Sequence, residues 1–319
     1  MTVTASASPS LALIKYWGKR PGGVNLPATS SLAVTLEGLR TTTRLRLRPD
    51  AAADEVVLGG HPQPAATFTP MIDLVRARAG STARVRAESE NSFPTAAGIA
   101  SSSSGFAALA LGLDALYETS LDRRELSSLA RLGSGSASRA VYGGFTTWRR
   151  GAEHAEPAFP ADHWPDLRVI VVVLRAAAKP VSSRSGMNRT SETSPVYPAW
   201  LDESEPLFER GLAALEARDL EALGTAMRES YLLMFASMLA AKPPIVYWQP
   251  ETVAVIHAAE SMRADGLPVW ETMDAGPQVK LLTTQAHVSQ IRERVLAIAP
   301  AAELIVAGPG GEPEVHGER

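Results

Sequence analysis

A loop of small residues that runs into an apolar segment constrains this fold more than any other feature. Residues Pro94 to Ser104 read PTAAGIASSSS, and Gly105 to Tyr117 are mostly alanine and leucine. Such a composition favours a buried helix. Small residues at its entrance let a ligand approach the free N–H groups and the positive end of the helix dipole. The pattern suits a phosphate site, although a serine linker or a well-capped helix would look the same.

Composition is that of an ordinary globular protein. The chain is 45% hydrophobic and 20% charged, as is typical of globular proteins. Its length of 319 residues fits about two domains. The chain has no cysteine, so disulfides, thiolate zinc sites and cysteine nucleophiles are excluded. A net charge of −3 gives no overall field for holding nucleic acid or an anionic membrane. Any anionic ligand must therefore be held by local groups.

Neither a targeting segment nor a metal motif is evident. No stretch approaches the ~18 apolar residues of a membrane span, and the first 20 residues lack the early basic residues of a secretory signal. The six histidines show no ligand spacing, and the glycines fit neither a Walker nor a Rossmann motif. We therefore expect a cytoplasmic protein with no membrane segment, no nucleic-acid partner and no metal held by protein ligands alone.

The pattern of apolar and polar residues along the chain predicts an α+β fold. Residues 31–36 and 41–48 alternate as strands do, and Leu167 to Leu174 read as a buried strand. The stretch after this strand is polar and rich in residues that interrupt helices and strands. We place a domain boundary there, which gives domains 1–178 and 179–319. In the second half, helical patterns cover 201–218, 220–240, 250–264 and 285–297, with strands near 269–272 and 304–307.

Two local features complete this prediction. A helix is expected from Asp122 to Leu132, with Ser120 as its N-cap. The tail from Gly308, which reads GPGGEPEVHGER, is expected to be mobile.

Four further segments could carry chemistry. Each also has a plainer interpretation: a capped helix with a surface arginine, a solvated basic turn, a turn aspartate or an interdomain linker. Five lysines occur among 31 basic residues, and two of them lie in one of these segments. The segments are GSGSASR at 133–139, KYWGK at 15–19, MDAGP at 273–277 and SSRSGM at 182–187.

Taken together and in order, these segments resemble a known family. The series ALIKYWGKR, NLP, SSLAVTL, SENSFPTAAGIASSSSGF, GSGSASRAVYGGF, SSRSGM and MDAGP is similar to the mevalonate diphosphate decarboxylases of the GHMP kinase superfamily. The resemblance runs from about Ala12 to Lys280. It implies a GHMP kinase fold, with a ribosomal-protein-S5-like N-terminal domain, a ferredoxin-like C-terminal domain and an active site in the cleft between them.

The resemblance also implies a reaction. ATP and Mg²⁺ would phosphorylate the C3 hydroxyl of mevalonate 5-diphosphate, and loss of phosphate and CO₂ would leave isopentenyl diphosphate. Mevalonate 5-phosphate is the alternative substrate. A mevalonate 3-kinase and a catalytically inactive nucleotide-binding relative are the remaining alternatives. A homodimer is expected from the family.

Site residues follow position by position from the resemblance. Asp274, Lys19 and Ser102 match catalytic positions, and Lys19 could also hold Asp274 ionised. The implied substrate-binding residues are Lys15, Tyr16, Lys19, Ser134, Ser136, Arg139, Ser183, Arg184 and Met187. The implied ATP-binding residues are Pro94, Ala97, Gly98, Ala100, Ser101, Ser102 and Ser103.

The sequence departs from the family in two places. Ser10 stands where an asparagine is common, so the contact of that asparagine is in question. In addition, no residue can be matched to the arginine that some relatives use on the terminal phosphate, which leaves the diphosphate and the monophosphate both open as substrates.

Overall fold

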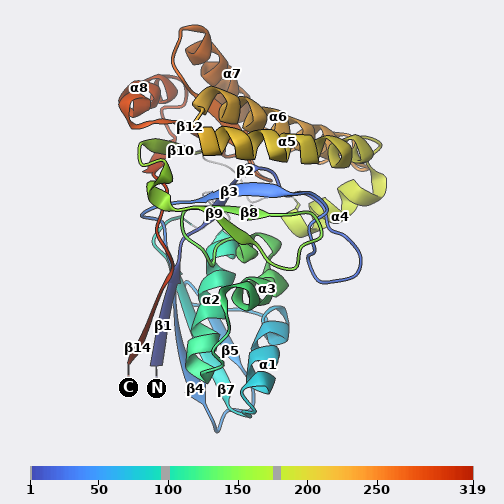
Figure 1. The fold of residues 1–319 in the computed structure, drawn as a ribbon, viewed down its shortest axis with the longest axis vertical. Helices are drawn as coiled ribbons and strands as arrows, with labels where there is room; N and C mark the ends of the chain where they lie inside the picture. The colour runs from blue at the N-terminus through green and yellow to red at the C-terminus, as the bar shows by residue number, and fades with distance from the viewer. Residues whose placement is uncertain (1, 95–100, 175–180, 319) are drawn as a thin grey trace.

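The computed structural model of this protein describes residues 2–94, 101–174 and 181–318. Helices and sheets are both extensive, which confirms the predicted α+β class (Figure 1). The helices are α1 (Thr69–Arg78), α2 (Ser101–Tyr117), α3 (Arg123–Gly133), α4 (Ser183–Thr193), α5 (Tyr197–Ala217), α6 (Leu220–Leu239), α7 (Pro250–Ala264) and α8 (Val288–Ile298).

A six-stranded sheet forms one end of the molecule, with α1, α2 and α3 on one face (Figure 1). Along β4, Thr41, Thr43 and Leu45 are buried, whereas Arg44 and Arg46 are exposed. This alternation of buried and exposed side chains is expected of a sheet with one face toward solvent. The strand order is β14 (Glu314–Glu318), β1 (Thr2–Ala7), β4 (Thr41–Arg48), β7 (Arg84–Asn91), β5 (Glu55–Leu58) and β6 (His61–Pro62).

The expectation of a mobile tail is wrong. Strand β14 pairs antiparallel with β1, with Thr2 opposite Glu318 and Ser6 opposite Glu314. The GPGG stretch that precedes it is also held in place, because the Gly310 N–H donates to the Thr35 carbonyl over 2.7 Å. The tail thus completes the edge of the N-terminal sheet (Figure 1).

Two four-stranded sheets make up the rest of the fold. Helices α5 and α6 pack on the first of these sheets, and their apolar side chains share a core with Leu13 and Leu32. The first sheet has the order β2 (Ser10–Ile14), β3 (Ser31–Thr35), β8 (Phe145–Trp148) and β9 (Glu156–Phe159). The second has the order β11 (Trp270–Met273), β12 (Val279–Thr284), β10 (Leu167–Val173) and β13 (Glu303–Ala307).

The strand predicted at 167–174 is confirmed as β10. It pairs with β12 and β13, which lie in the second half of the chain. This pairing favours a boundary ahead of β10, and the division at residue 178 stays a prediction.

The helix entrances differ in detail from the prediction. Helix α2 begins at Ser101, so the serines form its first turn instead of preceding it. Helix α3 is capped by Asp122, whose carboxylate accepts from the Glu125 N–H over 2.8 Å in a capping box. Ser120 has a φ of +53°, which is incompatible with the extended backbone of an N-cap, so the Ser120 prediction is wrong.

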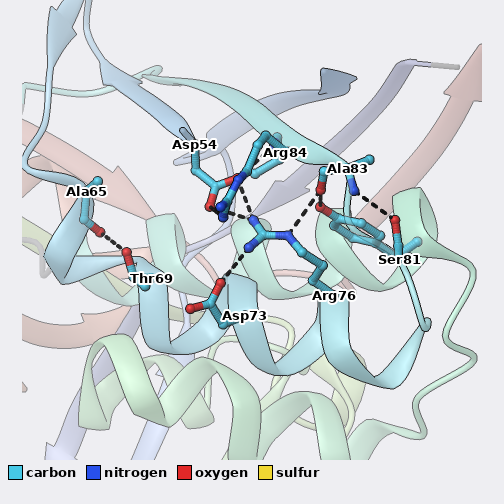
Figure 2. A network of polar contacts seen from close by, with 10 residues as sticks. Asp54, Ala65, Thr69, Asp73, Arg76, Ser81, Ala83 and Arg84 are labelled. Carbon is cyan, nitrogen blue, oxygen red and sulfur yellow. Dashed lines mark hydrogen bonds and ion pairs between the residues drawn. The ribbon is translucent and has the colours of Figure 1, made fainter. Parts of the chain in front are cut away.

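A buried arginine holds α1 against the six-stranded sheet (Figure 2). Arg76 donates to both carboxylate oxygens of Asp54 over 2.5 Å, to Asp73 and to the Ala83 carbonyl. The side chains of Arg76 and Asp54 are 9% and 6% exposed. Since Asp54 also accepts from the Val85 N–H, one pair ties α1 to the segment before β5 and to β7.

We expect Arg76→Ala to lower the free energy of unfolding by about 3–5 kcal/mol, because it leaves a buried carboxylate without its partner. Arg78→Ala is the matched control on the same helix, since its exposed pair with Glu125 is worth less than about 1 kcal/mol. Denaturant titration measures both changes. Equal losses in the two variants would contradict the proposed role of Arg76.

Candidate active site

An ion-paired aspartate lies at the end of β11. Asp274 accepts from the Lys15 ammonium over 3.0 Å through Oδ1, and its Oδ2 is 3.4 Å from the Lys280 ammonium. Lys15 follows β2, whereas Lys280 lies on β12 opposite Thr272 of β11. Strands from two different sheets therefore meet at one carboxylate.

Burial and charge together set the ionisation of this group. Burial of Asp274 by itself raises the pKa of its carboxyl, but Lys15 and Lys280 outweigh that effect and hold this pKa well below its usual range. Burial lowers the pKa of the Lys15 ammonium to about 8; Asp274 opposes this shift, and Lys280 and Arg139 add to it. The side chain of Asp274 is 26% exposed, so an ionised carboxylate is accessible to a ligand.

Arg139 brings a further buried positive charge. It is 2% exposed, and its Nη1 donates to the Ser31 hydroxyl over 2.6 Å. Its Nε has no hydrogen-bond partner among the described residues. Burial lowers its pKa to about 10, and the negative charge of Asp274 opposes this shift. A buried donor without a partner is costly, so Arg139 is suited to an anionic ligand.

The segment 15–19 places Tyr16 against the 133–139 segment, which carries this arginine. The Tyr16 ring packs on Trp148 with centroids 4.9 Å apart, and its buried hydroxyl has no hydrogen-bond partner within the described ranges. Burial raises the pKa of this hydroxyl, which therefore stays protonated and can donate. Gly18 has a φ of +104°, and a Cβ there would lie 1.9 Å from the Tyr197 hydroxyl, so the turn requires glycine.

Serines of two predicted segments meet at the start of α2. The hydroxyls of Ser102 and Ser134 are 3.4 Å apart, and those of Ser134 and Ser136 are 3.2 Å apart. Gly135, between the latter two serines, lies against the Tyr16 hydroxyl, and Arg184 donates to the Gly133 carbonyl over 3.2 Å. Contacts thus run from the first turn of α2 through the 133–139 segment to Tyr16 and Arg139.

Several predicted residues are placed differently from the rest. Ser103 is fully buried, and its hydroxyl accepts from the Ser10 N–H over 3.4 Å, so it faces the interior. Met187 is 8% exposed and packs in a core cluster with Trp17. Pro94 borders the undescribed segment 95–100, in which Ala97, Gly98 and Ala100 lie, and Ser183 is the first residue of α4.

One predicted role is wrong. Lys15, not Lys19, pairs with Asp274. Burial lowers the pKa of Lys19, and the positive charge of Arg184 adds to that effect. The participation of Lys19 in the reaction stays a prediction.

Two neighbours of Asp274 and Lys15 are not predicted from the sequence. Lys280 stands six residues after Asp274, and the hairpin of β11 and β12 brings it back beside Asp274. Ser230 of α6, whose hydroxyl accepts from the Lys15 N–H over 3.0 Å, gave no signal because a serine within a helix is unremarkable.

No group of three or more histidine, aspartate or glutamate side chains placed to hold a metal occurs in the described part of the chain. None of the described helices is long and apolar enough to cross a membrane.

Comparison with known proteins gives consistent matches over most of the chain. Residues 7–158 match the family model for the diphosphomevalonate decarboxylase-like N-terminal domain. Residues 169–308 match the mevalonate 5-diphosphate decarboxylase C-terminal domain. The two models together cover the segments from which the site is built.

Individual proteins agree with these models. The chain is 35% identical to the diphosphomevalonate decarboxylase of Ganoderma lucidum, over 94% of this chain and 82% of the relative. It is 33% identical to the phosphomevalonate decarboxylase of Haloferax volcanii, over 100% and 98%. A solved structure described as MDDEF in complex with MVAPP, AMPPCP and magnesium is 35% identical over 100% and 99%, with a TM-score of 0.93. The GHMP kinase fold is thereby confirmed.

Proposed function

The chain belongs to the diphosphomevalonate decarboxylase family, and we propose that it converts mevalonate 5-diphosphate and ATP into isopentenyl diphosphate, ADP, phosphate and CO₂. One observation carries this proposal for the site itself. Lys15 and Lys280, both nearly inaccessible to solvent, pair with the carboxylate of Asp274, and the equally buried Arg139 adds a third positive charge whose pKa Asp274 influences. Such an excess of buried positive charge is stabilised by a polyanionic ligand, and a substrate with a diphosphate and a carboxylate supplies one.

Asp274 has two tasks in this reaction. The C3 hydroxyl of the substrate is a poor leaving group until it becomes a phosphate ester, and Asp274 orients that hydroxyl and accepts a hydrogen bond from it. As the hydroxyl oxygen bonds to the γ-phosphorus, the bond to ADP breaks and the proton passes to the phosphate oxygens. When the phosphate leaves with the electrons of the C3–O bond, positive charge develops at C3. The carboxylate of Asp274, kept ionised by Lys15 and Lys280, stabilises that charge. The substrate carboxylate then leaves as CO₂, and its bonding electrons form the double bond.

The surroundings of Asp274 favour the second task. A carboxylate paired with two ammonium groups is a weak base, so it gains little from accepting the hydroxyl proton fully. The same pairing fixes a negative charge close to the developing cation at no cost of reorganisation. Asp274 therefore acts mainly as an electrostatic group.

The start of α2 fits the phosphates of ATP. The N–H groups of a helix's first turn lack partners within the helix, and the hydroxyl of Ser102, which Ser134 and Ser136 extend, lies at the same place. Ser101 and the loop that begins at Pro94 complete this part of the proposal. Mg²⁺ prefers a few oxygen ligands together with phosphate oxygens, and Ser102 would contribute one here, since both oxygens of Asp274 already face ammonium groups. When bound, the ion would neutralise charge on the phosphates.

Mevalonate 5-phosphate is the second candidate substrate. The match to the Haloferax volcanii enzyme, which is a phosphomevalonate decarboxylase, extends over nearly the whole of both chains. The two substrates share the C3 hydroxyl and the carboxylate, so Asp274 and its partners serve both.

A substrate comparison tests the proposal. The protein is incubated with ATP and Mg²⁺ plus mevalonate, its 5-phosphate or its 5-diphosphate, and ADP and CO₂ are measured together. We expect equal amounts of ADP and CO₂ from the diphosphate, with kcat/KM at least about tenfold above that for the monophosphate, since 1.4 kcal/mol of additional phosphate binding gives this factor.

The other outcomes identify the alternatives. A preference for the monophosphate assigns a phosphomevalonate decarboxylase. ADP without CO₂ assigns a 3-kinase, and no ADP from any of the three compounds assigns an inactive nucleotide-binding relative.

A further inference from the structure

We propose that Lys280 is a positioning residue for this reaction, because its ammonium group holds the Oδ2 side of the Asp274 carboxylate while Lys15 holds the Oδ1 side. The inference rests on the proposed function. It adds a residue to the site that acts through Asp274 instead of touching the substrate.

Burial of the charged Lys280 side chain costs free energy unless an opposite charge compensates it. Lys280 is 2% exposed on β12, and its neighbours along the strand, Val279 and Leu281, are fully buried. An ammonium group in such surroundings loses its hydration and must be compensated by hydrogen bonds and an opposite charge. Asp274 supplies that charge, and the Gln278 carbonyl accepts from the same ammonium over 3.4 Å.

The backbone that carries Lys280 is held in place by hydrogen bonds. Gln278 is joined to Leu174 at the end of β10 by two hydrogen bonds: the Leu174 N–H donates to its Oε1 over 2.6 Å, and its Nε2 donates to the Leu174 carbonyl over 3.1 Å. Strand β12 is itself paired on both sides, with β11 and β10. Lys280 therefore approaches Asp274 from a fixed direction.

The two lysines restrict the carboxylate in different ways. Lys15 is attached to the first four-stranded sheet, and Ser230 of α6 accepts from its backbone N–H. Lys280 is attached to the second four-stranded sheet, the same one as Asp274. With one oxygen bonded from each side, rotation of the carboxylate about its χ2 angle breaks one of the two pairs. Asp274 is thus held in one orientation before substrate binds, and such preorganisation matters most at the charged stage of the reaction.

Lys280 also affects the charge of Lys15. The charged groups that influence Lys15 are Asp274 after β11, Lys280 on β12 and Arg139 at the end of the 133–139 segment. After burial itself, Asp274 raises the pKa of Lys15, and the two cations lower it, giving a value of about 8. As the pH rises through this value, Lys15 loses its proton and the site loses a positive charge, so kcat/KM is expected to fall. Without Lys280 the pKa of Lys15 rises, and the fall occurs at a higher pH.

Lys280→Met tests the inference, with kcat, both KM values and the pH dependence of kcat/KM as readouts. We expect kcat to fall by about 10- to 100-fold, because misplacement by about 1 Å costs up to this much. The KM values should stay within about threefold, and the alkaline limb of the kcat/KM profile should move to higher pH. Lys280→Arg, which keeps the charge in a different shape, should recover part of kcat and bring the limb back toward that of the unaltered protein.

Lys242→Met is the matched control, since it removes an exposed lysine and should change neither readout. An unchanged kcat in Lys280→Met overturns the inference. So does a loss of kcat with the alkaline limb unmoved, because a merely structural lysine would act in that way. If the methionine variant does not fold, Lys280→Gln is judged by the same two criteria. All variants are assayed with whichever substrate the unaltered protein uses, so failure of the inference leaves the proposed function intact.

Discussion

Asp274→Asn is expected to lower kcat by roughly 10³- to 10⁴-fold while ATP and substrate still bind within about tenfold of normal. The substitution keeps the size of the side chain and removes its charge. Ground-state binding depends on Lys15, Lys280 and Arg139, which remain and which an anionic substrate still compensates. The transition state depends on the lost charge, because only there does C3 become positive.

Steady-state kinetics and equilibrium titration of ATP and substrate check this expectation, together with CO₂ release. Asp265→Asn is the matched control, because that aspartate is half-exposed and pairs with Arg294 on the surface. A kcat for Asp274→Asn within tenfold of the control would remove Asp274 from the chemistry.

The second large effect is expected at Arg139. Arg139→Ala removes a desolvated cation whose Nε is free to meet a ligand, and losing one partner of a buried charge pair costs about 2–5 kcal/mol. At 1.4 kcal/mol for each factor of ten, kcat/KM for the mevalonate substrate should fall by roughly 10²- to 10³-fold. KM for ATP should change much less.

Arg76→Ala provides a demanding control for this variant. Arg76 is also a buried arginine, but it donates to Asp54, Asp73 and the Ala83 carbonyl, none of which belongs to the proposed site (Figure 2). It should therefore destabilise the fold without altering kcat/KM at temperatures where the protein is folded. If Arg139→Ala behaves in the same way, Arg139 is a structural residue and not part of the substrate site.

Local patterns predicted most elements because their physical causes are local. The Ala/Leu run became α2, and the apolar run at 167–174 became β10, since burial on all sides leaves a simple signature in composition. Asp274, Arg139, Lys15 and Tyr16 were predicted as site residues only because their segments were considered together, and their roles stay predictions. Taken singly, each was better explained as turn or cap chemistry.

What the sequence did not predict depends on pairing across long distances. Lys280 comes close to Asp274 only because the β11–β12 hairpin brings it back there. Ser230 comes close to Lys15 only because α6 packs beside β2. The sequence favoured Lys19 over Lys15 as the partner of Asp274 for the same reason. The turn at Gly18 and the burial of Lys15 decide which lysine reaches Asp274, and spacing along the chain shows neither.

The pairing of β14 with β1 bears on how the chain folds during synthesis. Strand β1 is made before β14, and this partner for one of its edges emerges from the ribosome only after the C-terminal domain has been made. Until then that edge offers unpaired N–H and C=O groups to any other extended segment. The N-terminal sheet can therefore assemble early only as a five-stranded intermediate, and its completion waits for the rest of the polypeptide.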